Sequence, residues 1–210
     1  MKQALEFRTR PVRAALAGLA VACAAVAMPG CAPLVVGGAM VGGGMMAVDR
    51  RTAGTQVEDQ AIELKGAERA RQASSKGHVN LTSYNRMLLI TGEVPTEADK
   101  RAVEQALSQV EHVRSVVNEL AVAPNSALSG RSADAVVTGK VKAAFIDAKD
   151  LQAQAFKVVT ERGTVYLMGL VTEREATRAT EIARSTSGVK KVVRVIEVIS
   201  EADLARIQTK

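Results

Sequence analysis

The sequence predicts an α+β fold built from two copies of one small unit, each with the element order α-β-β-α-β. Three observations lead to this prediction. A strand–helix–strand pattern covers Gly163–Val193, a second copy of it covers Met87–Val117, and a strand and a charged helical segment precede each copy. Because a crossover helix joins two parallel strands, we expect each unit to form a three-stranded mixed sheet with two helices on one face.

The later copy shows the elements most clearly. Val165–Met168 is a short apolar run after a glycine, which is typical of a strand. Thr172 and Glu175 have the spacing of a capping box, which predicts the start of a helix. The β-branched run Val189–Ile199 predicts the closing strand. Between strand and helix lies Gly169, which we interpret as a structural turn that ends the strand.

The earlier copy matches the later one with a shift of one residue. Gly92 corresponds to Gly169, 77 positions on, and is predicted to make the same turn, whereas Thr96 corresponds to Thr172, 76 positions on. A repeat of this kind is more specific than either copy alone. The predicted hairpin turns are Asn85-Arg86 and Arg162-Gly163. The preceding strands and leading helices are Val79–Tyr84, Phe156–Thr160, Val57–Ala73 and Ala133–Ala148.

The N-terminal 30 residues read as a signal peptide. A basic segment is followed by the apolar run Ala14–Ala27, which is too short to span a bilayer. Cys31 follows Pro29-Gly30 as in a lipobox, where the cysteine is acylated; the alternative is an ordinary cleavage site with an incidental cysteine. The other cysteine, Cys23, lies inside the signal peptide, so we expect no disulfide and no thiol metal ligand.

The remaining boundaries follow from composition. Residues 31–53 are expected to form a lipidated, glycine-rich tether. We interpret this tether as flexible rather than as a helix that packs through its G-x-x-x-G motif. Asp49-Arg50-Arg51 is expected to place charge at the level of the lipid headgroups. The units span residues 54–123 and 133–200, and 201–210 is a tail. The linker 124–132 is short and polar, so we expect the two units to lie close together.

The leading helix of the second unit has an unusual outer face. Helical spacing places Val137, Val141 and Phe145 toward the core. Val136, Ala143 and Ile146 fall off that face, among Lys140 and Lys142. This pattern is typical of a helix that lies on an anionic membrane. The pattern is equally explained if Val136 and Ile146 pack against the first unit or its linker, and the sequence alone does not separate these two explanations.

Nothing in the sequence indicates catalysis. The two histidines, His78 and His112, lie at non-equivalent places, and no catalytic motif surrounds them. We therefore expect no enzyme, no cofactor and no metal. The formal net charge of +6 falls by half without the first 30 residues, which is too little to indicate nucleic-acid binding.

Several motifs resemble a known family. The element order, the glycine within each copy and the closing V-x-x-V-V strands at Val113–Val117 and Val189–Val193 resemble the BON domain. The strings YLMGLVTEREA, at Tyr166–Ala176, and NLTSYNRMLLITGEVP, at Asn80–Pro95, are similar to the DolP (YraP) family of outer-membrane lipoproteins. Members of that family carry two BON domains behind a lipid-modified cysteine.

The resemblance implies a function. It implies a non-enzymatic lipoprotein, anchored by Cys31 in the outer membrane and facing the periplasm, which supports envelope integrity and is enriched at division sites. It also implies that the leading helix of the second unit binds anionic phospholipid such as phosphatidylglycerol. The known family member carries a tryptophan where this chain aligns Val136, and Trp is the better interfacial anchor, so the affinity stays open. The alternative is an adaptor whose BON domains dock on an envelope protein.

Overall fold

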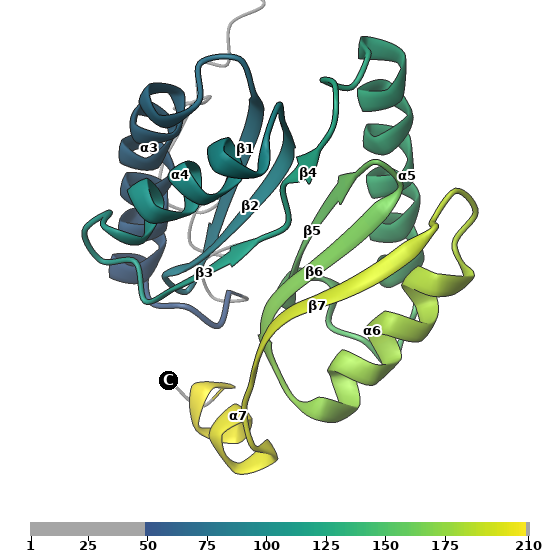
Figure 1. Cartoon of the computed structure of the whole chain (residues 1–210). Helices are drawn as coiled ribbons and strands as arrows, with labels where there is room; N and C mark the ends of the chain where they lie inside the picture. The colour runs from purple at the N-terminus through teal and green to yellow at the C-terminus, as the bar shows by residue number, and fades with distance from the viewer. Residues whose placement is uncertain (1–48, 209–210) are drawn as a thin grey trace, which may run out of the picture. The chain divides into compact units, whose positions relative to one another are not determined.

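The structure is a computed structural model that describes residues 49–208. The predicted signal peptide, Cys31 and the glycine-rich tether lie outside the described residues. Within the described part, the elements follow the predicted order twice (Figure 1), so the α+β fold of two repeated units is confirmed.

The first unit contains a mixed sheet covered by two helices on one face. β1 is antiparallel to β2, and both β3 and β4 are parallel to β2. Met87 lies opposite Ser115 and Glu93 opposite Ala121, so β3 and β4 share one register and act as a single strand interrupted at Glu119-Leu120. Its elements are α3 (Ala53–Ala73), β1 (His78–Tyr84), β2 (Met87–Val94), α4 (Glu97–Ser108), β3 (Ser115–Asn118) and β4 (Ala121–Val122).

The second unit repeats this plan with three strands, in the order β5-β6-β7. β5 and β6 are antiparallel, β6 and β7 are parallel, and α5 and α6 lie together on one face of the sheet (Figure 1). Its elements are α5 (Leu128–Asp147), the short 3₁₀ helix η1 (Ala153–Ala155), β5 (Phe156–Glu161), β6 (Thr164–Val171), α6 (Glu173–Ser185), β7 (Lys191–Val198) and a final helix α7 (Glu201–Gln208).

Two boundaries differ from the prediction. α5 begins at Leu128, so residues 128–132, expected as linker, are helical. The segment contains Gly130 and Ser132, which disfavour helices, yet the helix begins with a bond from Arg131 N to Ala127 O. The expected tail also holds a helix, α7, which begins where the Ser200 hydroxyl accepts a hydrogen bond from Asp203 N and which buries Leu204.

The predicted hairpin turns are confirmed. Asn85, Arg86, Arg162 and Gly163 all have positive φ, between 52° and 77°. Two consecutive residues of this kind make the tight turn whose twist matches that of a β-hairpin. The register agrees, since Tyr84 pairs with Met87 and Glu161 with Thr164.

The prediction that Gly92 and Gly169 end their strands is wrong. β2 continues past Gly92 to Val94, and β6 continues past Gly169 to Val171. Both glycines are needed for a different reason, which is the close approach of neighbouring backbone: strand β1 at Gly92 and the 3₁₀ helix η1 at Gly169. A Cβ on Gly92, whose φ is +110°, would lie 1.9 Å from His78 O, and one on Gly169 would lie 2.7 Å from Ala155 O.

Each sheet is buried on both faces. Alternate residues of a strand point to opposite sides, so β2 turns Leu88 and Ile90 toward its helices and Leu89 the other way. β6 likewise turns Leu167 toward its helices and Met168 away from them. The outward residues of both units meet in one buried cluster, which confirms that the units lie close together. Its buried members are Tyr84, Leu89, Tyr166, Met168 and Val195.

Candidate functional site

Helix α5 has one buried face and one exposed face along its 20 residues. Val137, Val141 and Phe145 point into the core of the second unit, as the helical spacing predicts. Phe145 packs edge-on against Phe156, with 5.4 Å between the ring centroids. These contacts fix the rotation of the helix about its axis, so the identity of the outer face is determined by the core.

The five residues predicted to contact lipid all lie on the exposed side of α5. Val136 is 58% exposed and Ile146 is 71% exposed, so they do not pack against the first unit. Lys140, Lys142 and Ala143 are exposed beside them. Among residues 49–208, neither lysine makes an ion pair with a carboxylate. Their contact with lipid stays a prediction.

A sixth residue, which was not predicted, belongs to this exposed face. Leu128 is 78% exposed and lies on α5, although the prediction placed it in the linker. It is 18 residues from Ile146, which is five full helical turns, so both side chains lie along one line of the helix surface. That spacing was visible in the sequence. A recess of about 150 Å³ adjoins the other end of this line, between Ile146, Lys142 and the aromatic rings of Phe145 and Phe156.

Arg50, expected to present its charge to lipid headgroups, is instead enclosed by the protein. Arg50 is buried, and its guanidinium makes two hydrogen bonds of 2.8 Å to the two carboxylate oxygens of Glu175. It also donates to Leu170 O and to Gln152. A guanidinium and a carboxylate that match in this two-bond geometry favour burial together over exposure of the arginine.

Glu175 has two roles at this point. It completes the predicted capping box, because its carboxylate accepts from Thr172 N while its own N–H donates to the Thr172 hydroxyl. Burial acts to raise the pKa of Glu175, but the hydrogen bonds from Arg50 and Thr172 N outweigh it and hold the pKa below the ordinary value. The carboxylate therefore stays ionised and ties the residues before α3 to the start of α6.

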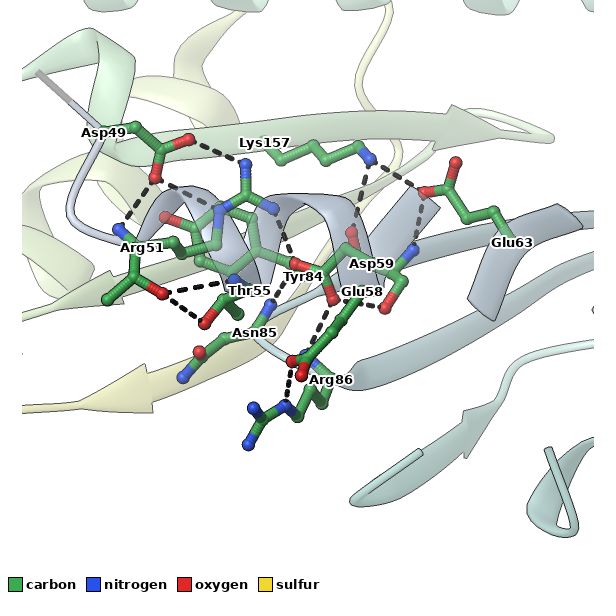
Figure 2. A network of polar contacts seen from close by, with 12 residues as sticks. Asp49, Arg51, Thr55, Glu58, Asp59, Glu63, Tyr84, Asn85, Arg86 and Lys157 are labelled. Atoms are coloured by element: carbon green, nitrogen blue, oxygen red, sulfur yellow. Dashed lines mark hydrogen bonds and ion pairs between the residues drawn. The ribbon is translucent and has the colours of Figure 1, made fainter. Parts of the chain in front are cut away.

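Arg51 is held by the first unit. Figure 2 shows its guanidinium between the carboxylates of Asp49 and Asp59, and its Nη1 lies 2.7 Å from Asp59 Oδ2. The guanidinium carbon also lies 4.1 Å from the centre of the Tyr84 ring, a cation–π contact. Burial and the charge of Asp49 raise the pKa of Tyr84 to about 12, so its hydroxyl stays protonated. The two consecutive arginines thus attach one to each unit.

Further polar contacts cross between the units around the apolar cluster. Lys157 of β5 lies 3.0 Å from Glu63 of α3 and also donates to Ser83 O (Figure 2). Glu197 of β7 accepts from Asn85 and Arg114, and the Arg114 contact is the main cause that lowers the pKa of Glu197. These contacts specify how the two sheets meet.

The two histidines differ in their surroundings. His112 is half-exposed beside Glu111. His78 lies at the start of β1 opposite Glu93, and its Nδ1 is 3.3 Å from the Glu93 carboxylate. Glu161, at the end of β5, completes a cluster that brings His78, Glu93 and Glu161 together from both units. No role for His78 was predicted, because no local sequence pattern links His78 to Glu161, which lies 83 positions away.

Among the described residues, none of the helices has both the length and the apolar character needed to cross a bilayer.

Comparisons with known proteins identify the class of this fold. The family model of the BON domain matches residues 58–124 and again residues 133–200. These two segments make up more than half of the chain and coincide with the two αββαβ units. The chain therefore belongs to the BON-domain family, with two copies of the domain.

Comparison with individual proteins shows which members of the BON-domain family this chain is similar to. The chain is 37% identical to an outer membrane lipoprotein, DolP, of Haemophilus influenzae, over 84% of this chain and 92% of the relative. It is 30% identical to a 21 kDa hemolysin of Actinobacillus pleuropneumoniae, over 72% of this chain and 80% of the relative. It is 26% identical to osmotically-inducible protein Y of Escherichia coli, over 66% and 72%. The first similarity confirms the predicted resemblance to the DolP lipoproteins and the predicted localisation as a lipoprotein of the outer membrane.

Proposed function

We propose that this protein is a non-enzymatic membrane module whose helix α5 binds anionic phospholipid of the phosphatidylglycerol type. The observation that carries the proposal is the outer face of α5. Three large apolar side chains, Leu128, Val136 and Ile146, are more than half exposed on one helix. Beside them lie Lys140 and Lys142, which form no ion pair with any other part of the described chain. An apolar stripe edged by lysines suits the boundary between lipid headgroups and acyl chains.

The charges and the apolar residues have separate tasks. Lys140 and Lys142 attract the helix to an anionic surface, and each lysine near such a surface contributes roughly 1 kcal/mol. Leu128, Val136 and Ile146 then enter the boundary region, where their apolar area leaves water. Val136 is smaller than the tryptophan of the known family member, and Leu128 adds apolar area at the beginning of the helix.

The acyl chains on Cys31 supply the second attachment. A lipid anchor keeps the two BON domains near the membrane, so α5 meets the lipid surface at a high effective concentration. A weak contact by α5 is then enough to make the position of the protein depend on lipid composition. We propose that this selects membrane regions rich in anionic lipid, including division sites, and that the protein supports envelope integrity there.

Vesicle flotation tests the lipid contact directly. The soluble fragment from Asp49 to Lys210, which retains Arg50 and Arg51, is mixed with vesicles of phosphatidylcholine alone or with added phosphatidylglycerol. We expect flotation only with the anionic vesicles. In 1 M salt, where the screening length is about 3 Å, binding should weaken strongly because the lysines lose their attraction.

Matched variants distinguish lipid binding by the exposed face of α5 from non-specific adsorption of the protein to vesicles. The double variants Val136→Glu with Ile146→Glu, and Lys140→Gln with Lys142→Gln, should each lose most of the binding. Leu64→Glu is the control, since Leu64 is 77% exposed on helix α3 of the first unit. No binding by the unmodified fragment, or equal loss with the control, would reject the proposal and favour an adaptor that docks on an envelope protein.

A further inference from the structure

Three side chains that commonly bind metal ions meet between the two BON domains. His78 and Glu93 lie opposite each other on β1 and β2 of the first domain, and Glu161 comes from the end of β5 in the second. One nitrogen of His78 and one carboxylate oxygen from each glutamate all lie within 4.8 Å of one another. Glu93 is completely buried and Glu161 is 93% buried, unlike the exposed acidic groups common on protein surfaces.

Within the described residues, the Glu161 carboxylate of this cluster has no positively charged partner. The one hydrogen bond to the Glu161 carboxylate in the described structure comes from the neutral amide of Asn80, at 2.9 Å. Glu93 meets one permanent cation, Arg162, at 3.4 Å. Arg131 lines the adjoining cavity but makes no ion pair with either glutamate in residues 49–208.

The chemistry of the three groups points to a transition-metal ion. Zn²⁺ binds both imidazole nitrogen and carboxylate oxygen, whereas Ca²⁺ and Mg²⁺ prefer oxygen ligands alone. We propose that His78, Glu93 and Glu161 bind a zinc ion that bridges the two BON domains. Its two positive charges would balance the charges of the two carboxylates.

The surroundings fit such a site. Both carboxylates are oriented by further hydrogen bonds, Glu161 by Asn80 and Glu93 by the backbone N–H and hydroxyl of Ser126. The imidazole side chain of His78 is 21% exposed, and a cavity of about 470 Å³ lined by His78, Asn80 and Glu161 gives access from solvent. Ligand atoms of a tetrahedral zinc site lie about 3.3 Å apart. The three ligand atoms here lie within 4.8 Å of one another, so no separation needs to shorten by more than roughly 1.5 Å.

Zinc titration of the complete mature lipoprotein tests this proposal. The protein is purified in detergent, freed of metal with a chelator, and titrated with ZnCl₂ in a calorimeter at pH 7.5. We expect one zinc ion per chain, a higher unfolding temperature with zinc, and no such effect of MgCl₂. Cobalt(II) at the same site should give the visible absorption of a tetrahedral complex.

Three variants make the outcome decisive. His78→Asn and Glu161→Gln should each weaken zinc binding by at least about tenfold, since even the loss of an outer-shell partner costs that much. Glu161→Gln removes a buried carboxylate, so the metal-free variant should be more stable than the unmodified protein at pH 7.5 while zinc no longer stabilises it. His112→Asn is the control and should bind zinc normally. Absence of zinc uptake by the unmodified protein, or uptake that survives His78→Asn, would overturn the proposal.

Discussion

Two aspartates perform the same task in the two domains. Asp59 accepts hydrogen bonds of 2.8 Å from the backbone N–H groups of Asn85 and Arg86, and Asp134 accepts two of 2.8 Å from Arg162 and Gly163. The N–H groups of a tight hairpin turn otherwise lack partners. Each aspartate comes from the leading helix of its domain, so the same contact fixes that helix on the hairpin.

At the residue scale, Gly92→Ala should be strongly destabilising. The positive φ of Gly92 and the 1.9 Å approach of His78 O leave no room for a methyl group, so strand β1 must move. We expect a loss of at least about 2 kcal/mol in the free energy of unfolding, measured by urea denaturation. Gly139→Ala is the control. A Cβ there meets nothing within 4 Å, and alanine should stabilise helix α5 by about 1 kcal/mol.

Removal of Arg50 should cost stability in a manner that depends on pH. Arg50→Met leaves the ionised Glu175 buried without its partner, which should cost roughly 3 kcal/mol at pH 7. In the unmodified protein the pKa of Glu175 lies below its unfolded value, so the contribution of the pair is present above that value and is lost as the pH falls through the folded pKa. In the variant Glu175 is protonated more readily, so the difference between the two proteins should shrink at pH 4.

Urea denaturation at both pH values measures this effect. Arg114→Met is the matched control, because Arg114 pairs with Glu197 but its side chain is 47% exposed. An exposed pair contributes under about 1 kcal/mol, so this control should change stability little. Equal losses for Arg50→Met and Arg114→Met would mean that burial does not strengthen the Arg50 contact.

At the scale of the element, α5 should separate stability from membrane binding. Phe145→Ala removes a buried ring from the core and should cost about 3–5 kcal/mol of unfolding free energy. Ile146→Ala, one position on, removes a side chain that is 71% exposed, so stability should change by less than about 0.5 kcal/mol. The same Ile146 variant should nevertheless reduce flotation with anionic vesicles. A large loss of stability with Ile146→Ala would show that its side chain is packed rather than exposed.

At the scale of the whole molecule, the two BON domains share a buried apolar cluster through the outer faces of their sheets. Met168 of β6 is completely buried there, together with Tyr84 and Leu89 of the first domain. Each domain alone has a modest core, and such small domains gain stability when they bury a second face. The two domains are therefore expected to unfold together.

Met168→Ala tests this coupling. The lost side chain should cost about 2–5 kcal/mol, and the loss should reach both domains. We expect hydrogen exchange to speed up in β2 of the first domain as well as in β6. Faster exchange confined to β5–β7 would show that the domains unfold independently. Val165→Ala is a useful comparison, since Val165 lies in the core of the second domain alone and should affect that domain first.

The sequence by itself determined the element order, the duplication, the hairpin turns, the capping box at Thr172 and the inner face of α5. Each of these is encoded in a pattern of a few neighbouring residues, so spacing alone is enough to find it. It did not determine the start of α5, because Gly130 and Ser132 weaken the local helical pattern of the first turn. The structural role of Gly92 and Gly169 could not be predicted from the sequence either, since it depends on how closely neighbouring backbone approaches each glycine.

Only the tertiary structure decided which buried charges meet. Arg50 and Glu175 are 125 positions apart, and His78 reaches Glu161 from the other domain. Local spacing carries no information on such pairs, because the docking of the two sheets brings them together. The physical reason is that the apolar faces determine how the sheets pack. The polar residues at the edges of these faces are then buried next to one another, and a buried polar group is unstable unless it is hydrogen-bonded or paired.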